Sequence, residues 1–210
     1  MSSVSFIGLG TMARAIAARA LVGGNAVELI GRDAAKAKGL AGALGGGATV
    51  GTFGAAPAGD IVVLAVPYSS ALAVVAKYGD ALAGKVIIDI SNTFNADFTG
   101  LVTPDGTFGA KEIARAVPAS AHVVKAFNSV FGHVLAQLPE ERSLDVFFAG
   151  DDAPAKKSVS TFIQSLGLRP LDVGGLAMAR WLEGAGPLLM GVARHGVGTF
   201  NIALGLTLPR

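Results

Sequence analysis

Short apolar runs along the chain alternate with longer stretches in which apolar residues recur every three or four positions. The runs are rich in β-branched and aromatic residues and predict strands from residue 4 and at 26–30, 48–51, 61–66, 85–90, 122–127, 145–150 and 168–173. The stretches between them predict helices at 12–22, after Asp33, and at 70–83, 110–117 and 153–166. Residues 95–109 are expected to form a loop, and the pattern is helical from 176 almost to the end.

This order of elements predicts a Rossmann-type α/β fold, doubly wound, with a mostly parallel sheet and a long C-terminal helix. The run at 61–66 is apolar throughout, as expected for a central strand that is buried on both faces. The chain has 210 residues and no long linker, so we expect a single dinucleotide-binding domain. Residues 1–150 would form the Rossmann core, and residues 151–210 an extension that completes the substrate slot.

The first strand turns on two glycines directly into the first helix, in the sequence Gly8-Leu9-Gly10-Thr11-Met12-Ala13. Gly8 permits the sharp turn, Gly10 lets the backbone approach a pyrophosphate, and Ala13 lets the helix pack close to the strand. The helix N-terminus offers free N–H groups and a positive dipole end to the anion. An ordinary glycine turn is the alternative for the bare motif, but the strand at 26–30 completes the strand–helix–strand unit of about 30 residues that a dinucleotide fold needs.

The end of the strand at 26–30 indicates which dinucleotide is bound. NAD-specific sites usually place Asp or Glu there, whereas this chain has Gly31 and Arg32, with Lys36 one turn further on. Gly31 leaves space, Arg32 can stack on adenine and pair with a 2′-phosphate, and Lys36 can add a second charge. Asp33 is expected to cap the next helix. The pattern favours NADP; the alternative is that Arg32 and Lys36 are solvated surface charges.

Residues suited to a hydride-transfer slot follow the central strands, where the crevice of this fold opens. Pro67 and Tyr68 follow one strand, Asn92 the next, and Asn128 and Ser129 a third. Hydride transfer between two flat rings needs positioning and exclusion of water rather than covalent help. We therefore predict no particular catalytic acid. Turn formation is the alternative role for Pro67 and Asn92.

Composition narrows the classes of function. The net charge of +2 is too small to indicate nucleic-acid binding, and the absence of cysteine excludes disulfides and thiolate metal sites. No His, Asp or Glu cluster has metal-ligand spacing, so we expect no metal. The N-terminus enters the first strand almost at once, which leaves no room for a signal peptide and predicts a cytoplasmic protein.

The most apolar segment, residues 184–206, contains Pro187, Arg194, His195 and Asn201. Such groups are costly inside a bilayer, so a membrane span is not expected. We predict a buried or interfacial helix, interrupted at Pro187 and Gly191, that pairs with its copy in a homodimer; packing on its own sheet is the alternative.

Several motifs together point to a known family. They are the glycine turn, Gly31-Arg32-Asp33 with Lys36, Leu64-Ala65-Val66-Pro67, Val86-Ile87-Ile88-Asp89, Val123-Val124-Lys125-Ala126-Phe127-Asn128-Ser129, and Gly167-Leu168-Arg169-Pro170-Leu171-Asp172-Val173-Gly174. In these the chain resembles the NADPH-dependent coenzyme F420 reductases, also called F420H2:NADP oxidoreductases, and the related oxidoreductase domain of the STEAP metalloreductases. The resemblance extends over essentially the whole chain.

The resemblance implies that Thr11 and Met12 contact the pyrophosphate, and that Arg32 and Lys36 hold the 2′-phosphate. It also implies that Val66 and Pro67 line the ribose and nicotinamide, and that residues 126–129 border the place where the two rings meet. The chain departs from the family at Asn128, where archaeal enzymes can have His, at 175–178, which lacks a serine, and at 91–94, which lacks a proline. These departures concern the second substrate more than the NADP site.

The expected function is hydride transfer between NADP(H) and a deazaflavin, coenzyme F420, or a flavin. The predicted NADP(H) site comprises Gly8, Leu9, Gly10, Thr11, Met12, Ala13, Gly31, Arg32, Lys36, Ala65, Val66, Pro67, Asn92, Ala126 and Asn128. The predicted substrate slot comprises Pro67, Tyr68, Asn128, Ser129, Ala177 and Met178. The alternatives are a non-catalytic NADP-binding module that senses redox state, and an imine or β-hydroxyacid reductase, whose families resemble only the front of this chain.

Overall fold

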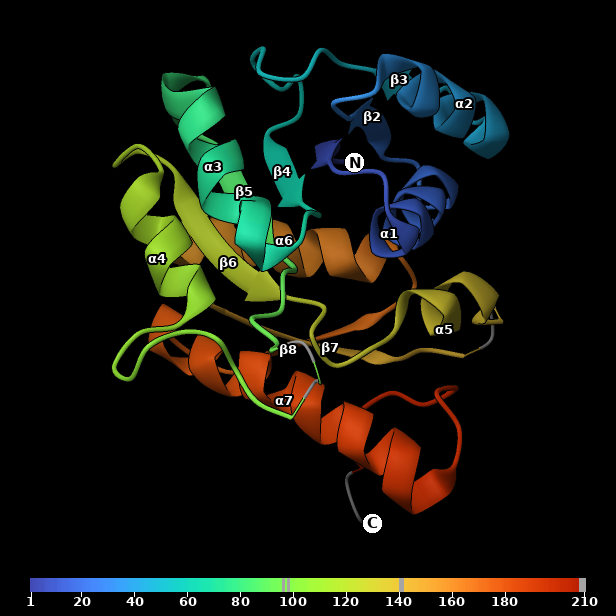
Figure 1. Ribbon diagram of the computed structural model, residues 1–210. Coiled ribbons are helices and arrows are strands. Elements are labelled where there is room, and N and C mark those ends of the chain that lie inside the picture. The colour runs from blue at the N-terminus through green and yellow to red at the C-terminus, as the bar shows by residue number, and fades with distance from the viewer. Residues whose placement is uncertain (96, 98, 140–141, 208–210) are drawn as a thin grey trace.

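The structure, a computed structural model, describes residues 1–95, 97, 99–139 and 142–207. Within these residues a single sheet of eight strands has the order β3-β2-β1-β4-β5-β6-β7-β8. The strands are β1 (Ser3–Ile7), β2 (Ala26–Ile30), β3 (Thr49–Val50), β4 (Ile61–Leu64), β5 (Val86–Asp89), β6 (His122–Ala126), β7 (Asp145–Gly150) and β8 (Arg169–Asp172). Neighbouring strands are parallel except β6 and β7, which are antiparallel. The predicted Rossmann-type, mostly parallel fold is confirmed (Figure 1).

Helices cover both faces of the sheet. The α-helices are α1 (Thr11–Val22), α2 (Ala34–Leu44), α3 (Tyr68–Tyr78), α4 (Gly109–Ala116), α5 (Gly132–Gln137), α6 (Ala153–Ser165) and α7 (Ala179–Gly191). Shorter 3-10 segments are η1 (Gly79–Leu82) and η2 (Leu176–Met178), and a π-helix, η3 (Val192–Val197), continues α7. Buried residues of α1, α2, α5 and α6 share one hydrophobic cluster, and those of α3 and α4 share another, so the two groups of helices lie on opposite faces.

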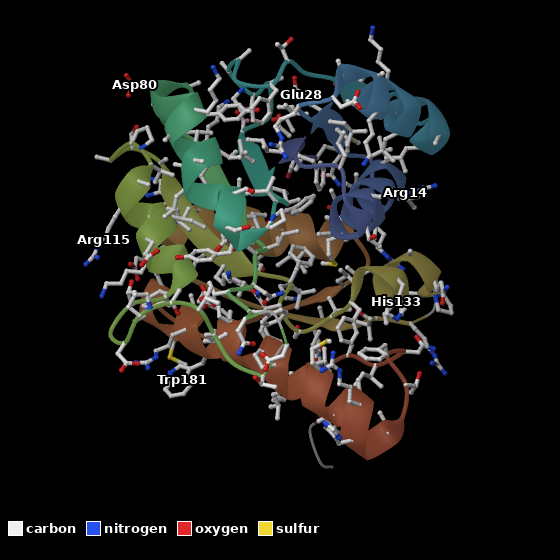
Figure 2. The ribbon with its side chains drawn as sticks, viewed as in Figure 1. Arg14, Glu28, Asp80, Arg115, His133 and Trp181 are labelled. Atoms are coloured by element: carbon white, nitrogen blue, oxygen red, sulfur yellow. The ribbon has the colours of Figure 1, made fainter. Side chains whose placement is uncertain are left out.

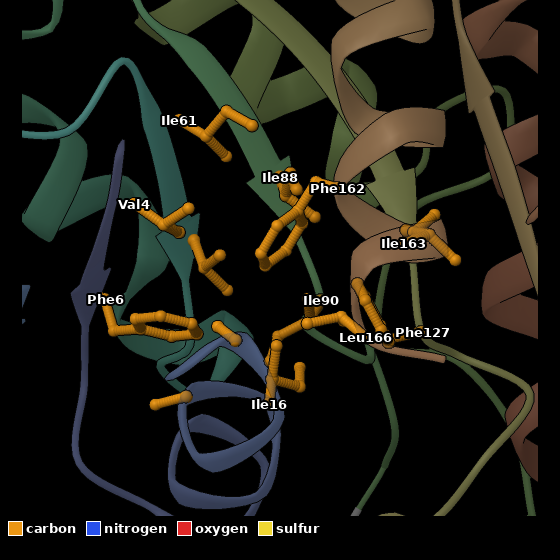
Figure 3. Packing of buried hydrophobic residues seen from close by; sticks show 14 of the residues in the cluster. Val4, Phe6, Ile16, Ile61, Ile88, Ile90, Phe127, Phe162, Ile163 and Leu166 are labelled. Carbon is orange, nitrogen blue, oxygen red and sulfur yellow. The ribbon is translucent and has the colours of Figure 1, made fainter. Parts of the chain in front are cut away.

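The first cluster explains why α1 lies so close to the strands. Its sheet-facing positions are small, because Ala13, Ala17 and Ala20 are all completely buried. Ile16 is the larger side chain of this face and meets the core near Ile90 and Leu166, while Phe162 of α6 packs over Ile88 (Figure 3). The alanines therefore bring the N-terminus of α1 close to the end of β1.

The chain reverses its direction of winding between β1 and β4. From β1 it moves outward through β2 to β3, and then returns to β4 on the other side of β1 and moves outward through β5 to β6. The loops that follow β1 and β4 consequently diverge toward opposite faces. In open α/β sheets this switch point is where a ligand crevice forms.

The structure differs from the sequence prediction at several elements. The strand predicted at 61–66 ends at Leu64, so that Ala65 and Val66 leave the sheet. The helix predicted at 70–83 begins earlier, at Tyr68, and tightens into η1 after Tyr78. The short helix α5 was not predicted, because its six residues are too few for a helical period to be recognised. The strand at 145–150 was predicted correctly, but only the structure gives its antiparallel pairing.

The C-terminal helix is shorter than predicted. Pro187 lies inside α7 rather than interrupting it, and the helical segment ends at Val197 instead of running to 206. Gly198 adopts a left-handed conformation with φ +67°, which ends the helix. The following residues return to the body of the protein, where Ala203 bridges to Val130 and the Leu204 N–H donates to Ser129 O. Among the described residues, no helix combines the length and hydropathy that a membrane span requires.

Candidate functional site

A cavity of about 660 Å³ opens at the switch point between β1 and β4. This volume is within the range of roughly 300–1,000 Å³ that is usual for small-molecule sites. The cavity is lined by the turn after β1, the tip of β2 with the first turn of α2, the segment after β4, and one face of α3. It brings together most of the predicted cofactor residues, namely Gly8, Leu9, Gly10, Gly31, Arg32, Lys36, Ala65, Val66 and Pro67.

The glycine turn has the geometry that a bound pyrophosphate requires. Gly8 has φ +119°, and a Cβ there would lie 2.1 Å from the carbonyl oxygen of Ala65, so a side chain is excluded. A Cβ on Gly10 would meet no described atom within 4 Å, which leaves open space above the N-terminus of α1. The first turn of α1 contains no acidic residue, and no side chain caps it. Its N–H groups and dipole are therefore available to an anion.

The tip of β2 presents positive charge and no ribose-binding acid. As predicted, Asp33 caps α2: its carboxylate accepts a hydrogen bond of 3.0 Å from the N–H of Lys36. Arg32 and Lys36 are exposed and line the cavity. The space expected beside Gly31 is partly filled, because a Cβ on Gly31 would lie 2.4 Å from Cδ1 of Leu9. Gly31 therefore accommodates the Leu9 side chain as well as lining the cavity.

A second hollow adjoins the cavity on the other side of the glycine turn. It is lined by residues of α1 and α2 that include Thr11, Arg14 and Lys36, and it shares Leu9 and Gly10 with the first cavity. Thr11 thus faces this hollow, and Lys36 lies between the two spaces. The side chain of Arg14 points outward from α1, at the edge of the molecule (Figure 2).

At the ends of β5 and β6, Asn128 joins two loops. Its Nδ2 donates to Ser91 O at 2.9 Å and to the Asn92 side-chain oxygen at 2.7 Å, while its own Oδ1 is buried and has no partner among the described residues. The preceding residue, Phe127, has φ +66°, a conformation that costs a non-glycine residue roughly 1–3 kcal/mol. This turn directs the chain so that the Asn128 amide reaches Ser91. The amide thus fastens the loop after β5 to the loop after β6, and its buried Oδ1 is not exposed at the cavity.

Three completely buried charges lie beside this amide. The Lys125 ammonium is 2.8 Å from Asp89 Oδ2 and 3.3 Å from Glu183 Oε1, and it donates to Ser91 O at 2.6 Å. Ser91 O therefore accepts from both Lys125 and Asn128. Lys125 and Asp89 belong to the motifs of the family resemblance, but the sequence analysis named neither of them, nor Glu183, as a site residue. The signal that could have found them is a charged residue inside an otherwise apolar strand or helix, because such a charge is usually paired or functional.

Glu183 connects α7 to the loops around the crevice. Its carboxylate accepts hydrogen bonds from the N–H groups of Gly109 and Ala110, at 2.9 and 3.0 Å, and from the Thr93 hydroxyl at 3.1 Å. It thus caps the N-terminus of α4 and favours its dipole. The position of Glu183 on α7 places a residue of the C-terminal extension at the ends of β5 and β6.

Tyr68 begins α3 and is half-buried beside the charged cluster of Lys125, Asp89 and Glu183. Its hydroxyl donates a hydrogen bond to Glu112. Burial raises the pKa of the Tyr68 phenol well above its usual value, and the hydrogen bond to Glu112 and the charges of Glu112, Glu183 and Asp89 raise it further. The phenol is therefore neutral at physiological pH and serves as a hydrogen-bond donor.

Other predicted site residues lie elsewhere. Ala13 and Ala126 are completely buried in the core, and the half-buried Met12 packs against Gly132 of α5. The buried Ser129 hydroxyl donates to Asp145 O at 3.4 Å, toward β7. Ala177 and Met178 are exposed in η2, which packs near α4 and β7. None of these six residues lines the cavity at the switch point, and the same is true of four further predicted residues, Thr11, Tyr68, Asn92 and Asn128.

Residues 3–93 match the family model described as "NADP oxidoreductase coenzyme F420-dependent". The F420-dependent NADP reductase of Methanocaldococcus jannaschii is 31% identical over 144 residues, which are 66% of this chain and 64% of that protein. The predicted family resemblance is confirmed. The segment of this chain that the family model matches includes the glycine turn, the tip of β2, and the ends of β4 and β5.

Two further proteins extend the comparison. Metalloreductase STEAP3 of Rattus norvegicus is 30% identical over 180 residues, which are 86% of this chain but 35% of that protein. The matched part of this chain thus spans less than two thirds of STEAP3 and less than two thirds of the Methanocaldococcus jannaschii reductase. A crystal structure from Arthrobacter sp. FB24, described as a candidate F420-dependent NADP reductase, has a TM-score of 0.85 at 24% identity. It covers 99% of this chain and 100% of its own, so the two share the whole fold.

Proposed function

We propose that this chain is an NADP-dependent oxidoreductase that transfers a hydride between NADP(H) and the deazaflavin coenzyme F420. The observation that carries the proposal is the cavity at the switch point, where a glycine turn adjoins a strand tip that bears Arg32 and Lys36 in place of a ribose-binding acid. The F420-dependent NADP reductases that the chain resembles give the second substrate.

The residues at the cavity divide into three roles. The N–H groups at the start of α1 hold the pyrophosphate, and Arg32 and Lys36 hold the 2′-phosphate. Val66 and Pro67 form an apolar wall beside the nicotinamide, and Asn128, which is not itself a cavity residue, holds the loop after β5 in place through Ser91 O. NADPH, when bound, supplies the hydride that the deazaflavin accepts. The protein contributes alignment of the two rings and exclusion of water.

We further propose that residues 151–210 complete the slot for the second ring. Support comes from Glu183 of α7, which holds both the loop after β5, through Thr93, and the N-terminus of α4. By position, Tyr68 and Asn128 face this slot. Ala177 and Met178 would border it only from the outer side of α4, so we assign them a smaller part.

An acceptor screen tests the function. The protein is mixed with NADPH or NADH and with coenzyme F420, FMN or FAD, and the nicotinamide and acceptor absorbance bands are followed. We expect oxidation of NADPH with F420 as acceptor and a much slower reaction with NADH. Faster reduction of a flavin would reassign the acceptor, and reduction of a cyclic imine would favour the imine reductase alternative. Binding of NADP(H) without turnover on any acceptor would favour the redox-sensing module.

We also propose a homodimer that forms through the C-terminal helical segment. Trp181, Leu188 and Val192 are exposed by 62%, 60% and 38%, and their spacing of seven and four residues places them along one side of α7 and its continuation. Trp181 projects from α7 away from the sheet (Figure 2). A second copy would bury this apolar stripe.

Light scattering at micromolar concentration tests the dimer. Leu188→Glu should shift the mass toward that of a monomer, whereas Leu72→Glu on α3, which also removes an exposed leucine, should not. A monomeric parent protein would refute the proposal. The proposed cytoplasmic location is tested separately, by fractionation of cells that produce the protein.

A further inference from the structure

One face of α3 lines the cofactor cavity along its whole length. Ser70, Ala73, Val74 and Lys77 recur at intervals of three and four residues, and all four are cavity residues. Arg32 and Lys36 line the same cavity from the tip of β2 and the first turn of α2. Helices α2 and α3 lie on opposite sides of the strands β1 and β4 (Figure 1). Lys77 therefore approaches the cavity from the wall opposite to the two cations that sequence reasoning selected.

The loop that follows β3 packs against the last turn of α3, next to Lys77. The ring of Phe53 packs edge-on against Tyr78, with 5.7 Å between ring centroids, and Phe53 also lines the cavity. Gly54 comes next with φ +87°, and a Cβ on it would lie 2.8 Å from Cε of Lys77. The aliphatic stem of the exposed Lys77 thus passes close to the backbone at Gly54, a position whose positive φ favours glycine. The last turn of α3 and the loop after β3 therefore meet at this end of the cavity.

The cations at this end of the cavity have no carboxylate partners. Among the described residues, Arg32, Lys36 and Lys77 make no ion pair. The carboxylate of Asp33, which also lines the cavity, accepts the N–H that caps α2. Three like charges around one cavity repel one another until an anion enters. The N-terminus of α1 accounts for the pyrophosphate, so the three side chains call for a further anionic group.

We propose that Lys77 is a third ligand of the 2′-phosphate and a determinant of the preference for NADP(H) over NAD(H). The 2′-phosphate would lie between the two walls, with Arg32 and Lys36 on one side and Lys77 on the other. An ammonium group is a point donor suited to a phosphate oxygen that the planar guanidinium of Arg32 leaves free. The inference rests on the proposed NADP(H) site and concerns binding alone.

Two nucleotides that differ only in the 2′-phosphate, 2′,5′-ADP and 5′-ADP, provide the test. Their dissociation constants are measured by calorimetry for the parent protein, Lys77→Met and Lys77→Arg. The matched control is Lys38→Met, an exposed lysine of α2 that is not among the cavity residues. We expect Lys77→Met to weaken 2′,5′-ADP about tenfold and to leave 5′-ADP within about twofold, with Lys77→Arg and Lys38→Met close to the parent.

Each other outcome has a definite meaning. Equal weakening of both nucleotides by Lys77→Met would place Lys77 at the adenine or pyrophosphate and overturn the proposal, as would no weakening of either. Weak binding of 2′,5′-ADP to the parent protein would instead refute the NADP(H) site itself. Tight binding of 2′,5′-ADP without hydride transfer to F420 would refute the proposed reaction and leave the role of Lys77 standing.

Discussion

The ammonium of Lys125 lies 2.8 Å from the carboxylate of Asp89, and both side chains are completely buried. The pair joins the ends of β5 and β6, and Glu183 adds a second buried carboxylate from α7 at 3.3 Å from the same ammonium. Burying charges is costly unless they are paired and hydrogen-bonded, and here each charged group has several partners. The cluster fixes the loop of Ser91, and through it the amide of Asn128.

Substitution of Lys125 by Met should destabilise the protein strongly. The change leaves two buried carboxylates without a counter-charge, and breaking such a pair costs about 3–5 kcal/mol. Urea denaturation would measure the loss. The control is Lys156→Met, which removes the partly exposed pair with Asp172 and should cost less than about 1 kcal/mol. Similar losses in the two variants would show that the buried cluster is not a structural centre.

Substitution of Asn128 by Ala should slow hydride transfer more than it weakens nucleotide binding. The amide reaches Ser91 O and Asn92, so its loss frees the loop after β5, which we propose lies beside the nicotinamide. We expect a fall in kcat of about 10- to 100-fold, because small errors in ring alignment are costly. The dissociation constant of 2′,5′-ADP should change little, since Arg32 and Lys36 remain.

The neighbouring variant Ser129→Ala is the control for Asn128→Ala. The Ser129 hydroxyl faces Asp145 O rather than the cavity, so kcat should stay within about twofold of the parent. A larger effect of Ser129→Ala than of Asn128→Ala would contradict the assignment of Asn128 to the nicotinamide.

Tyr68 should not ionise in the alkaline range in which an exposed tyrosine does. Burial and the hydrogen bond to Glu112 raise its pKa, so the folded protein keeps the phenol proton more tightly than the unfolded chain. The stability that this contributes is present below about pH 10, the usual tyrosine pKa, and is lost as the pH rises further. We expect parallel rate profiles for the parent and Tyr68→Phe up to about pH 10. A break in the parent alone, below that pH, would disprove the neutral phenol.

The tail after η3 should loosen on acidification. Asp145 accepts a hydrogen bond from Arg169 Nη2 at 2.7 Å and from the Leu206 N–H at 2.6 Å, and these contacts hold the pKa of Asp145 below its usual value. A depressed carboxyl pKa contributes stability above the unfolded value of about 3.9, and this is lost as the pH falls.

Substitution of Arg169 by Ala tests this contribution. Arg169 is half exposed, so we expect a modest loss of stability at pH 7, measured by thermal or urea unfolding. The variant should then lose less stability than the parent between pH 7 and pH 3, because its Asp145 titrates closer to the unfolded value. An equal acid loss in both proteins would exclude Asp145 as the responsible group.

The fold and the cofactor half of the site follow largely from local sequence. The strand at 26–30 and the strand at 145–150 were predicted to the residue, and Asp33 caps α2 as expected. Strand periodicity, capping and the glycine turn are decided by residues close together in the chain. The turn at Gly8 and the tip at Arg32 belong to one strand–helix–strand unit, so their meeting at one cavity could also be predicted.

The remainder was decided by contacts between distant segments. Lys125, Asp89 and Glu183 come from β6, β5 and α7, and no local pattern shows that they share one ion cluster. Ser129 and Asn128 are neighbours in sequence, yet the turn at Phe127 sends one side chain toward β7 and the other toward Ser91. The return of the C-terminal tail to Ser129 also depends on a tertiary hydrogen bond, from the Leu204 N–H.

The sequence by itself thus determined the glycine turn and the charged strand tip that build the proposed dinucleotide site, because short-range geometry forms that half of the site. Only the tertiary structure decided that Lys77 of α3 and Arg32 line one cavity, and that Glu183 of α7 reaches the loop after β5. Burial, pairing of charges and side-chain direction arise when separate elements pack together, so the spacing of residues along the chain does not predict them.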